Sequence, residues 1–184
     1  MPRIKPIDPS QAKGKLKTLF EGFQKAYGMT PPNIMTTMAH SPAVLEAFLN
    51  FNKAMGTSSL SSLLREQIAV AISGVNACEY CASSHSFLAK MLKLDEEELD
   101  ANLQGLSRDP KVQTALKFSQ SVVLNRGWVD NEEVQRVRDA GYSEAELVEI
   151  IAAVAITIFT NYFNHIAQTE VDFPLVTVGE AVTN

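Results

Sequence analysis

The sequence predicts an all-α protein, a helical bundle of seven to eight helices. Apolar residues recur at intervals of three and four along most of the chain, and no segment shows the alternation typical of a strand. Capping residues precede several of these segments and glycines follow them. A chain of 184 residues can form one well-packed core but is short for two. No linker-like segment interrupts it, so we expect a single domain over residues 1–184.

The first half of the chain contains four expected helices, over residues 8–28, 41–56, 60–77 and 79–94. The first has Ser10 near its N-cap and is followed by a turn, "GMTPPNI". Ser41 is a favourable N-cap for the second, Pro42 suits its first position and Gly56 ends it. The connection between the third and fourth is short, so these two helices should be antiparallel neighbours.

The second half contains four more, over residues 95–103, 109–127, 130–141 and 143–170. Asp95 caps the first of these, and Asp109 caps the next, where proline again takes the first helical position. Ser143 with Glu146 matches a capping box at the start of the last helix. The remaining tail should be irregular.

Composition and charge exclude several classes of protein. The net charge is −5, and the 16 Lys and Arg residues are scattered, which argues against binding to nucleic acid or to an anionic membrane. The N-terminus lacks the apolar segment of a secretory signal. The most apolar stretch, residues 147–163, contains Glu149 and Asn161 and falls short of a membrane span. We therefore expect a cytoplasmic protein without a membrane partner.

The feature that carries chemistry is "NACEYCASSHSFLAK", residues 76–90, which contains the two cysteines of the chain. On a helix that begins near Cys78, the residues Cys78, Cys81 and His85 share one face. Positions three apart bring α-carbons to roughly 5–6 Å, a separation that a disulfide tolerates. In the cytoplasm, a CxxC pair is more often redox-active or metal-binding than a structural disulfide.

Two local effects could activate these thiols. A free thiol is only about 3% thiolate at pH 7. The positive end of the helix acts most directly on Cys78, whereas His85, one turn further along, acts on Cys81. Glu66 lies in the preceding helix at the edge of an apolar stripe, where its carboxylate could hold a proton or orient the imidazole.

Other interpretations of the same residues stay open. The cysteines could be ordinary core residues beside an unremarkable histidine. A zinc site needs a fourth ligand, which Glu66 or His165 could supply. A thioredoxin-like fold is excluded because no strands surround the motif. His165 lies in a polar cluster near the end of the last helix, where a helix end or a subunit contact is favoured over a catalytic role.

The spacing "EQIAVAISGVNACEYCASSH", Glu66 to His85, resembles the motif of the alkylhydroperoxidase AhpD-like family, part of the carboxymuconolactone decarboxylase superfamily. "FTNYFNHIAQTEVDFP" resembles the C-terminal segment of its uncharacterised peroxidase-related branch. "GMTPPNI" followed by a short helix and "SPAVLEAF" is similar to its N-terminal half. The resemblance covers most of the chain and implies one AhpD-like domain over residues 1–184, with the CxxC core motif region at about 60–95.

This resemblance implies a cysteine-dependent peroxidase of the peroxiredoxin type, with an antioxidant role and no cofactor or metal. Cys81 would attack an (alkyl)hydroperoxide and form a sulfenic acid, Cys78 would then close a disulfide, and His85 and Glu66 would relay protons. An external dithiol, lipoyl-dependent or other, would reduce the disulfide. Well-studied members carry a second histidine where this chain has Tyr80, and a phenol is a poor base at pH 7.

Two other functions are considered beside the peroxidase, and the last helix predicts an assembly state. The same disulfide would suit a non-enzymatic redox sensor or adaptor. Decarboxylase or lactone chemistry occurs in superfamily relatives that typically lack the cysteine pair. Residues 146–163 are apolar in almost every helical direction, so this helix should be central or covered by another subunit. With the family resemblance, this predicts a homo-oligomer, a hexamer built as a trimer of dimers.

Overall fold

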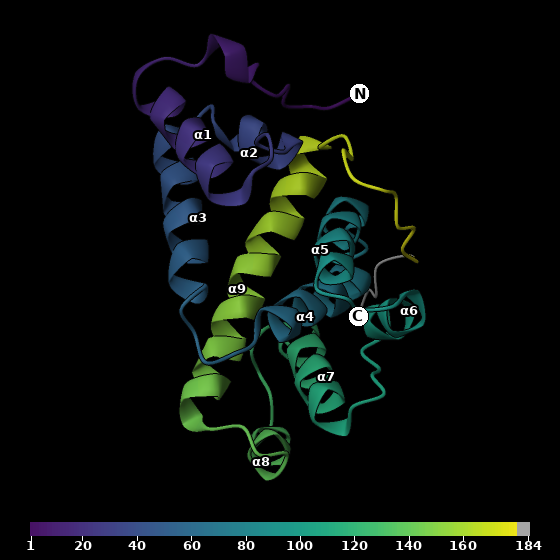
Figure 1. The fold of residues 1–184 in the computed structure, drawn as a ribbon. Helices are drawn as coiled ribbons and strands as arrows, with labels where there is room; N and C mark the ends of the chain where they lie inside the picture. Colours follow the sequence, from purple (N-terminus) through teal and green to yellow (C-terminus); the bar gives the residue numbers. More distant parts are fainter. Residues whose placement is uncertain (180–184) are drawn as a thin grey trace.

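The computed structural model describes residues 1–179, and every regular element in that range is helical (Figure 1). The elements are the 3-10 turn η1 (Pro9–Gln11) and the helices α1 (Gly14–Tyr27), α2 (Asn33–Met38), α3 (Pro42–Met55), α4 (Ser62–Val75), α5 (Glu79–Met91), α6 (Glu96–Leu103), α7 (Pro110–Leu124), α8 (Asn131–Asp139) and α9 (Glu144–Ala167). The all-α prediction is confirmed. The eight helices expected from periodicity are α1 and α3–α9, and α2 is the short helix that only the family resemblance implied.

Side-chain caps fix most helix starts as the sequence indicated. Ser41, Asp95, Asp109 and Ser143 each accept a backbone N–H from the first turn of the helix that follows. Ser143 also takes part in a complete capping box, because the Glu146 carboxylate accepts the Ser143 backbone N–H at 2.7 Å. These local hydrogen bonds satisfy N–H groups that a helix start leaves without partners.

The expected cap at Ser10 is wrong. Asp8 caps instead, and its carboxylate accepts the Ser10 N–H at 2.8 Å, which closes only the single turn η1. Ala12 is then extended, with ψ of 136°, so the helix cannot continue. α1 begins afresh at Gly14, after Lys13, which makes no side-chain cap.

α4 is the central helix of the bundle. It packs against α5, α6, α7 and α9, and its contact with α5 is the most extensive among the described helices. Ile68, Val70 and Ile72 are fully buried. Gly74 allows α6 to approach closely, because a β-carbon at this position would lie 2.2 Å from the Leu103 carbonyl oxygen. The absence of a side chain at Gly74 therefore sets the distance between α4 and α6.

α9 runs through the middle of the molecule (Figure 1). Its length and composition would allow it to cross a membrane, unlike the shorter apolar stretch considered from the sequence. In the structure it packs against α3, α4, α5 and α7, and Ile150 and Val154 belong to the main hydrophobic core. These contacts are those of the core helix of a globular domain.

The N-terminal helices form a layer over one end of α9 (Figure 1). Their apolar residues build a second core that also contains Cys78, Tyr80 and Cys81. The chain end is attached to the same region, because the Arg3 backbone N–H donates to the carbonyl of Ala167 at 2.8 Å. The cysteine motif thus lies at the junction between the N-terminal layer, α5 and α9.

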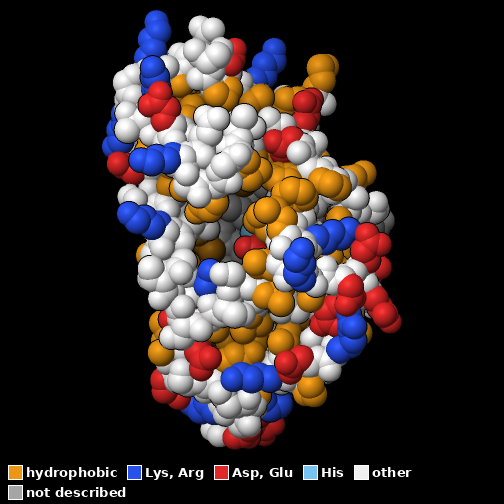
Figure 2. Space-filling model, in the orientation of Figure 1, with side chains coloured by type: hydrophobic (Ala, Val, Ile, Leu, Met, Phe, Trp, Pro, Cys, Tyr) orange, Lys and Arg blue, Asp and Glu red, His pale blue; other side chains and the backbone are white. Residues whose placement is uncertain are grey.

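Part of the surface of α9 stays exposed as an apolar stripe. Val148, Ile151, Phe159, Tyr162 and Ile166 recur at helical spacing, and each side chain is between 42% and 65% exposed. Figure 2 shows hydrophobic side chains gathered along the middle of this face of the molecule, with a hollow among them. A stripe of this kind is typical of a surface that another subunit covers.

Replacing Gly74 by alanine should destabilise the protein, because the added methyl group meets backbone atoms of α6 that cannot rotate away. We expect a loss of about 1–3 kcal/mol in the free energy of unfolding, the usual effect of overpacking. Gly22→Ala in α1 is the matched control. Its new β-carbon meets nothing within 4 Å, so it should be neutral or stabilise by up to about 1 kcal/mol. Urea denaturation measures both, and equal stabilities would contradict the close packing.

The exposed stripe of α9 generates a prediction about assembly. Light scattering should give the mass of a homo-oligomer, with a hexamer expected, and Ile151→Lys should lower that mass because it places a charge in the covered surface. Ser121→Lys on α7, outside the stripe, is the control. A mass near the 20.2 kDa of a single chain across the micromolar range would show that the stripe stays in contact with water.

Candidate functional site

A tight turn places Cys78 at the start of α5. Ala77 adopts a left-handed conformation, with φ of 51°, in the position that glycine usually occupies. The Cys78 N–H donates to the Ser73 carbonyl at 2.9 Å, and the Ala77 N–H donates to that of Gly74 at 3.2 Å, which is the Schellman pattern. Cys78 is consequently the N-cap of α5, and its sulfur accepts the Cys81 N–H at 3.4 Å.

The two sulfurs are adjacent and buried. Both cysteines are free thiols, the Sγ atoms lie 2.7 Å apart, and the Cys78 thiol donates to the Cys81 sulfur. Each residue is only 1% exposed. The spacing expected from an i, i+3 pair is therefore present, and formation of a disulfide would need only a small movement of the side chains.

Two amides from α9 approach the sulfurs. Asn164 Nδ2 donates to Cys81 Sγ at 3.2 Å. One turn earlier, Asn161 Oδ1 accepts from Asn76 Nδ2 at 2.8 Å, and Asn161 Nδ2 donates to the Ser73 hydroxyl at 3.5 Å. The sequence placed these asparagines in a polar cluster near His165 but did not connect them with the cysteines. Their two buried amides on an otherwise apolar helix were the available signal.

The surroundings shift the pKa values of the two thiols in opposite directions. Burial alone would raise the pKa of Cys81, but the hydrogen bond from Cys78, the charge of His85 and the asparagine amides together lower this pKa to about 7. The same hydrogen bond to Cys81 raises the pKa of Cys78, and burial raises it further. The helix-end argument favoured a thiolate at Cys78, whereas these contacts favour ionisation of Cys81 first.

Glu66 and His85 form a hydrogen-bonded pair. Glu66 Oε2 lies 2.7 Å from His85 Nδ1, so the carboxylate reaches the imidazole as the sequence predicted. The side chains are 21% and 26% exposed. Burial lowers the pKa of His85, but the charge and hydrogen bond of Glu66 and the charge of Cys81 outweigh it, so the net shift is upward. His85 can therefore carry a proton next to an ionised Cys81.

Tyr80 connects the motif to both ends of the chain. Its hydroxyl donates to Asp172 Oδ1 at 2.8 Å and accepts the Ile34 N–H at 3.1 Å, while Asp172 Oδ2 accepts the Asn33 N–H at 2.8 Å. Burial is the main reason that the pKa of Tyr80 is raised. The hydroxyl proton is thus committed to Asp172, and Tyr80 acts here as a structural tie, not as a base.

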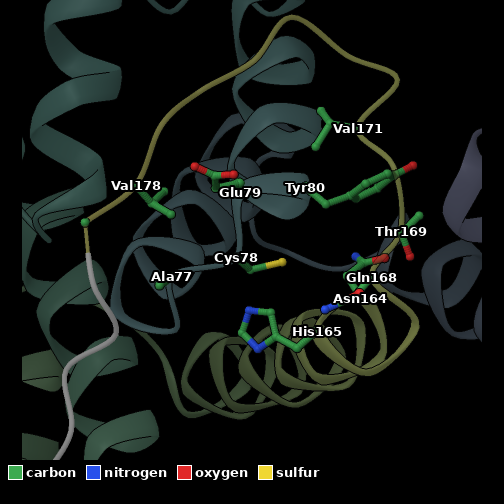
Figure 3. A pocket seen from close by; sticks show the side chains of 11 residues that line it. Ala77, Cys78, Glu79, Tyr80, Asn164, His165, Gln168, Thr169, Val171 and Val178 are labelled. Atoms are coloured by element: carbon green, nitrogen blue, oxygen red, sulfur yellow. The ribbon is translucent and has the colours of Figure 1, made fainter. Parts of the chain in front are cut away.

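A cavity of about 400 Å3 lies beside Cys78. It is lined by Ala77, Cys78, Glu79, Tyr80, Asn164, His165, Gln168, Thr169, Val171, Val178 and Gly179. Figure 3 shows Asn164 and His165 projecting from α9 toward Cys78. The structure thus brings the four predicted site residues together and places His165 at this cavity. Within residues 1–179, no three His, Cys, Asp or Glu side chains are grouped as a metal site would require.

The contacts of Cys81 predict a pH dependence. Because its pKa is lowered to about 7, the thiolate fraction, and with it the rate of alkylation by iodoacetamide, should rise with pH and be half-maximal near pH 7. Asn164→Leu and His85→Gln should each move this midpoint upward, because each removes an interaction that favours the thiolate. Peptide mass spectrometry would assign the modified sulfur, and a wild-type midpoint near the ordinary thiol value of about 8.5 would contradict the assignment.

The carboxymuconolactone decarboxylase family profile matches residues 42–121, which contain α3 to α6 and most of α7, including the cysteine motif. No curated protein sequence matches the chain.

Three solved structures share the fold. An uncharacterized peroxidase-related protein from Silicibacter sp. TM1040 is 22% identical, with a TM-score of 0.79 over 91% of this chain and 92% of its own. An AhpD-core, uncharacterized peroxidase-related protein from Ralstonia eutropha JMP134 is 20% identical, with a TM-score of 0.83 over 93% and 92%. The debrominase Bmp8 is 25% identical, with a TM-score of 0.78 over 92% of both chains. The profile match shows that residues 42–121 are similar to the carboxymuconolactone decarboxylase family, and the shared architecture shows that the chain has an AhpD-like fold.

Proposed function

We propose that the protein is a cysteine-dependent peroxidase that reduces hydroperoxides, including alkyl hydroperoxides, with Cys81 as the attacking residue. The observation that carries the proposal is the environment of Cys81. Its sulfur accepts hydrogen bonds from the Cys78 thiol at 2.7 Å and from the Asn164 amide at 3.2 Å, and His85, paired with Glu66 of α4, follows one helical turn later. A nucleophile, a resolving thiol and a proton carrier are thus present at one site.

The reaction follows from this arrangement. The Cys81 thiolate attacks one peroxide oxygen, the O–O bond breaks, and the alcohol leaves with a proton from His85, which Glu66 orients. Cys81 is then a sulfenic acid. The Cys78 sulfur attacks the Cys81 sulfur, its proton leaves with the hydroxyl group as water, and a disulfide forms. The protein has supplied two electrons and must receive two from outside.

An external dithiol completes the proposed cycle, because thiol–disulfide exchange returns both cysteines to the reduced state. A lipoyl-dependent or another dithiol system would serve. Such a cycle belongs in a compartment that keeps thiols reduced, so we place the protein in the cytoplasm. In the proposed hexamer, each subunit carries a complete dithiol, because Cys78, Cys81, Glu66 and His85 come from one chain.

A second candidate is reductive removal of a halogen from an aromatic ring. The similar debrominase Bmp8 has also been solved in complex with 2,3,4-tribromopyrrole. A dithiol can perform this chemistry if the Cys81 thiolate takes the bromine, the ring carbon keeps the C–Br electrons and gains a proton, and Cys78 then displaces bromide. The products are the debrominated ring, bromide and the same disulfide.

Steady-state assays distinguish these functions. With dithiothreitol as reductant, the wild-type protein should consume cumene hydroperoxide catalytically, and Cys81→Ser should abolish turnover. Cys78→Ser should leave a Cys81 sulfenic acid that dimedone traps once. Glu66→Gln and His85→Gln should each lower the rate by roughly 10²–10⁴, as expected for a lost proton carrier. Ser84→Ala, which removes a hydroxyl that donates to the Cys81 backbone carbonyl and not to a sulfur, is the control.

Other outcomes of the same assays point elsewhere. Bromide release from a bromopyrrole without peroxide consumption would support the second candidate. Stoichiometric oxidation without turnover under any reductant would indicate a sensor. Trapping of sulfenic acid in Cys81→Ser and not in Cys78→Ser would reverse the roles of the two cysteines.

A further inference from the structure

The cavity beside Cys78 provides access to only one of the two sulfurs. Cys78 is part of its lining, whereas Cys81, His85 and Glu66 are not. The side chains of Glu66 and His85 are also partly exposed, but neither of them lines this cavity. A molecule that enters this cavity therefore meets Cys78 first.

Two residues that line the cavity carry buried oxygen atoms without a hydrogen-bond partner. Asn164 is 4% exposed, and its Oδ1 atom has no hydrogen-bond partner among the described residues. The Thr169 hydroxyl is also buried without such a partner, and the Glu79 carboxylate lies in the same lining. A buried acceptor without a donor is destabilising. A ligand that brings an N–H group is consequently favoured, and an anionic ligand is disfavoured by Glu79.

We propose that this cavity is the entry site for the thiol that reopens the Cys78–Cys81 disulfide, that the incoming sulfur attacks Cys78, and that the cavity selects thiols carrying an N–H donor. This proposal rests on the proposed function in one respect: the Cys78–Cys81 disulfide must form and be reduced again in each catalytic cycle.

The leaving group supports attack at Cys78. The incoming thiolate forms a bond to the Cys78 sulfur, the S–S bond breaks, and its electron pair goes to Cys81. The Asn164 amide donates to that sulfur, and His85, whose pKa is raised, can add a positive charge nearby. Thiol–disulfide exchange is faster when the leaving sulfur is the more acidic one. A second thiol then attacks the mixed disulfide and releases Cys78 and an oxidised small-molecule disulfide.

The size of the cavity limits the ligand to a slender one. A volume of about 400 Å3 is at the small end of the range for small-molecule sites. A folded protein partner would instead need about 800 Å2 of complementary surface. The part of a reductant that enters is therefore a free thiol or a thiol at the end of a narrow chain.

The point of attack can be determined without peroxide. The disulfide is made with diamide, exposed briefly to N-acetylcysteamine and quenched with acid. The freed thiol is then labelled with N-ethylmaleimide, and tandem mass spectrometry locates both groups. We expect the N-acetylcysteamine adduct on Cys78 and the maleimide on Cys81. An adduct on Cys81 would overturn the proposal.

Selection by the cavity is tested with a pair of thiols. N-acetylcysteamine should reduce the diamide-made disulfide faster than 2-mercaptoethyl acetate, which has an ester oxygen in place of the N–H, by roughly 3- to 10-fold per thiolate. Thr169→Val should diminish this ratio, and Thr18→Val, on the exposed surface of α1, should not. Equal rates for the two thiols would refute the cavity as a binding site.

These results are independent of the peroxidase assay. If the diamide-made disulfide is reduced as described but hydroperoxide is not consumed, the proposed function fails and the entry site stands. If hydroperoxide is consumed but the adduct forms on Cys81, the proposed function stands and the entry site fails.

Discussion

The hydrogen bond from Asn164 to the Cys81 sulfur is the interaction on which the site depends. It joins α9, the core helix, to α5, which carries the motif, through two side chains that are almost fully buried. A buried anion without donors would be strongly disfavoured. A hydrogen bond to a charged group contributes about 1.5–3 kcal/mol, so this single contact favours the thiolate form and the docking of the two helices together.

The two cysteines are unequal because their neighbours are unequal. Cys81 accepts hydrogen bonds from Cys78 and Asn164 and lies near an imidazole whose pKa is raised, whereas Cys78 is the donor to Cys81 and borders a cavity. His85, four residues after Cys81, already makes the motif asymmetric, and Asn164 on α9 and Glu66 on α4 add to the difference. The fold thus separates the sulfur whose ionisation is favoured from the sulfur that borders the cavity.

The parts of the site that could be predicted are local in sequence. Cys78, Cys81 and His85 share a helix face by their spacing, and Glu66 follows from the short connection between α4 and α5. Asn164 lies 83 residues from Cys81 and Asp172 lies 92 from Tyr80. No periodicity reports such distant contacts, because they depend on how helices pack and not on local hydrogen bonds. The wrong prediction at Ser10 has a local cause. Asp8 and Ser10 are both suitable N-cap residues, and it is Asp8 that caps the turn.

The separation in sequence between Cys81 and Asn164 has a consequence for the time course of synthesis. Contacts between distant segments form late, because the intervening chain must be ordered first. During translation the cysteine motif leaves the ribosome well before α9 exists. Until α9 docks, Cys81 lacks its amide donor and keeps a more ordinary, less ionised thiol. The low pKa of Cys81 therefore arises only when the fold is complete.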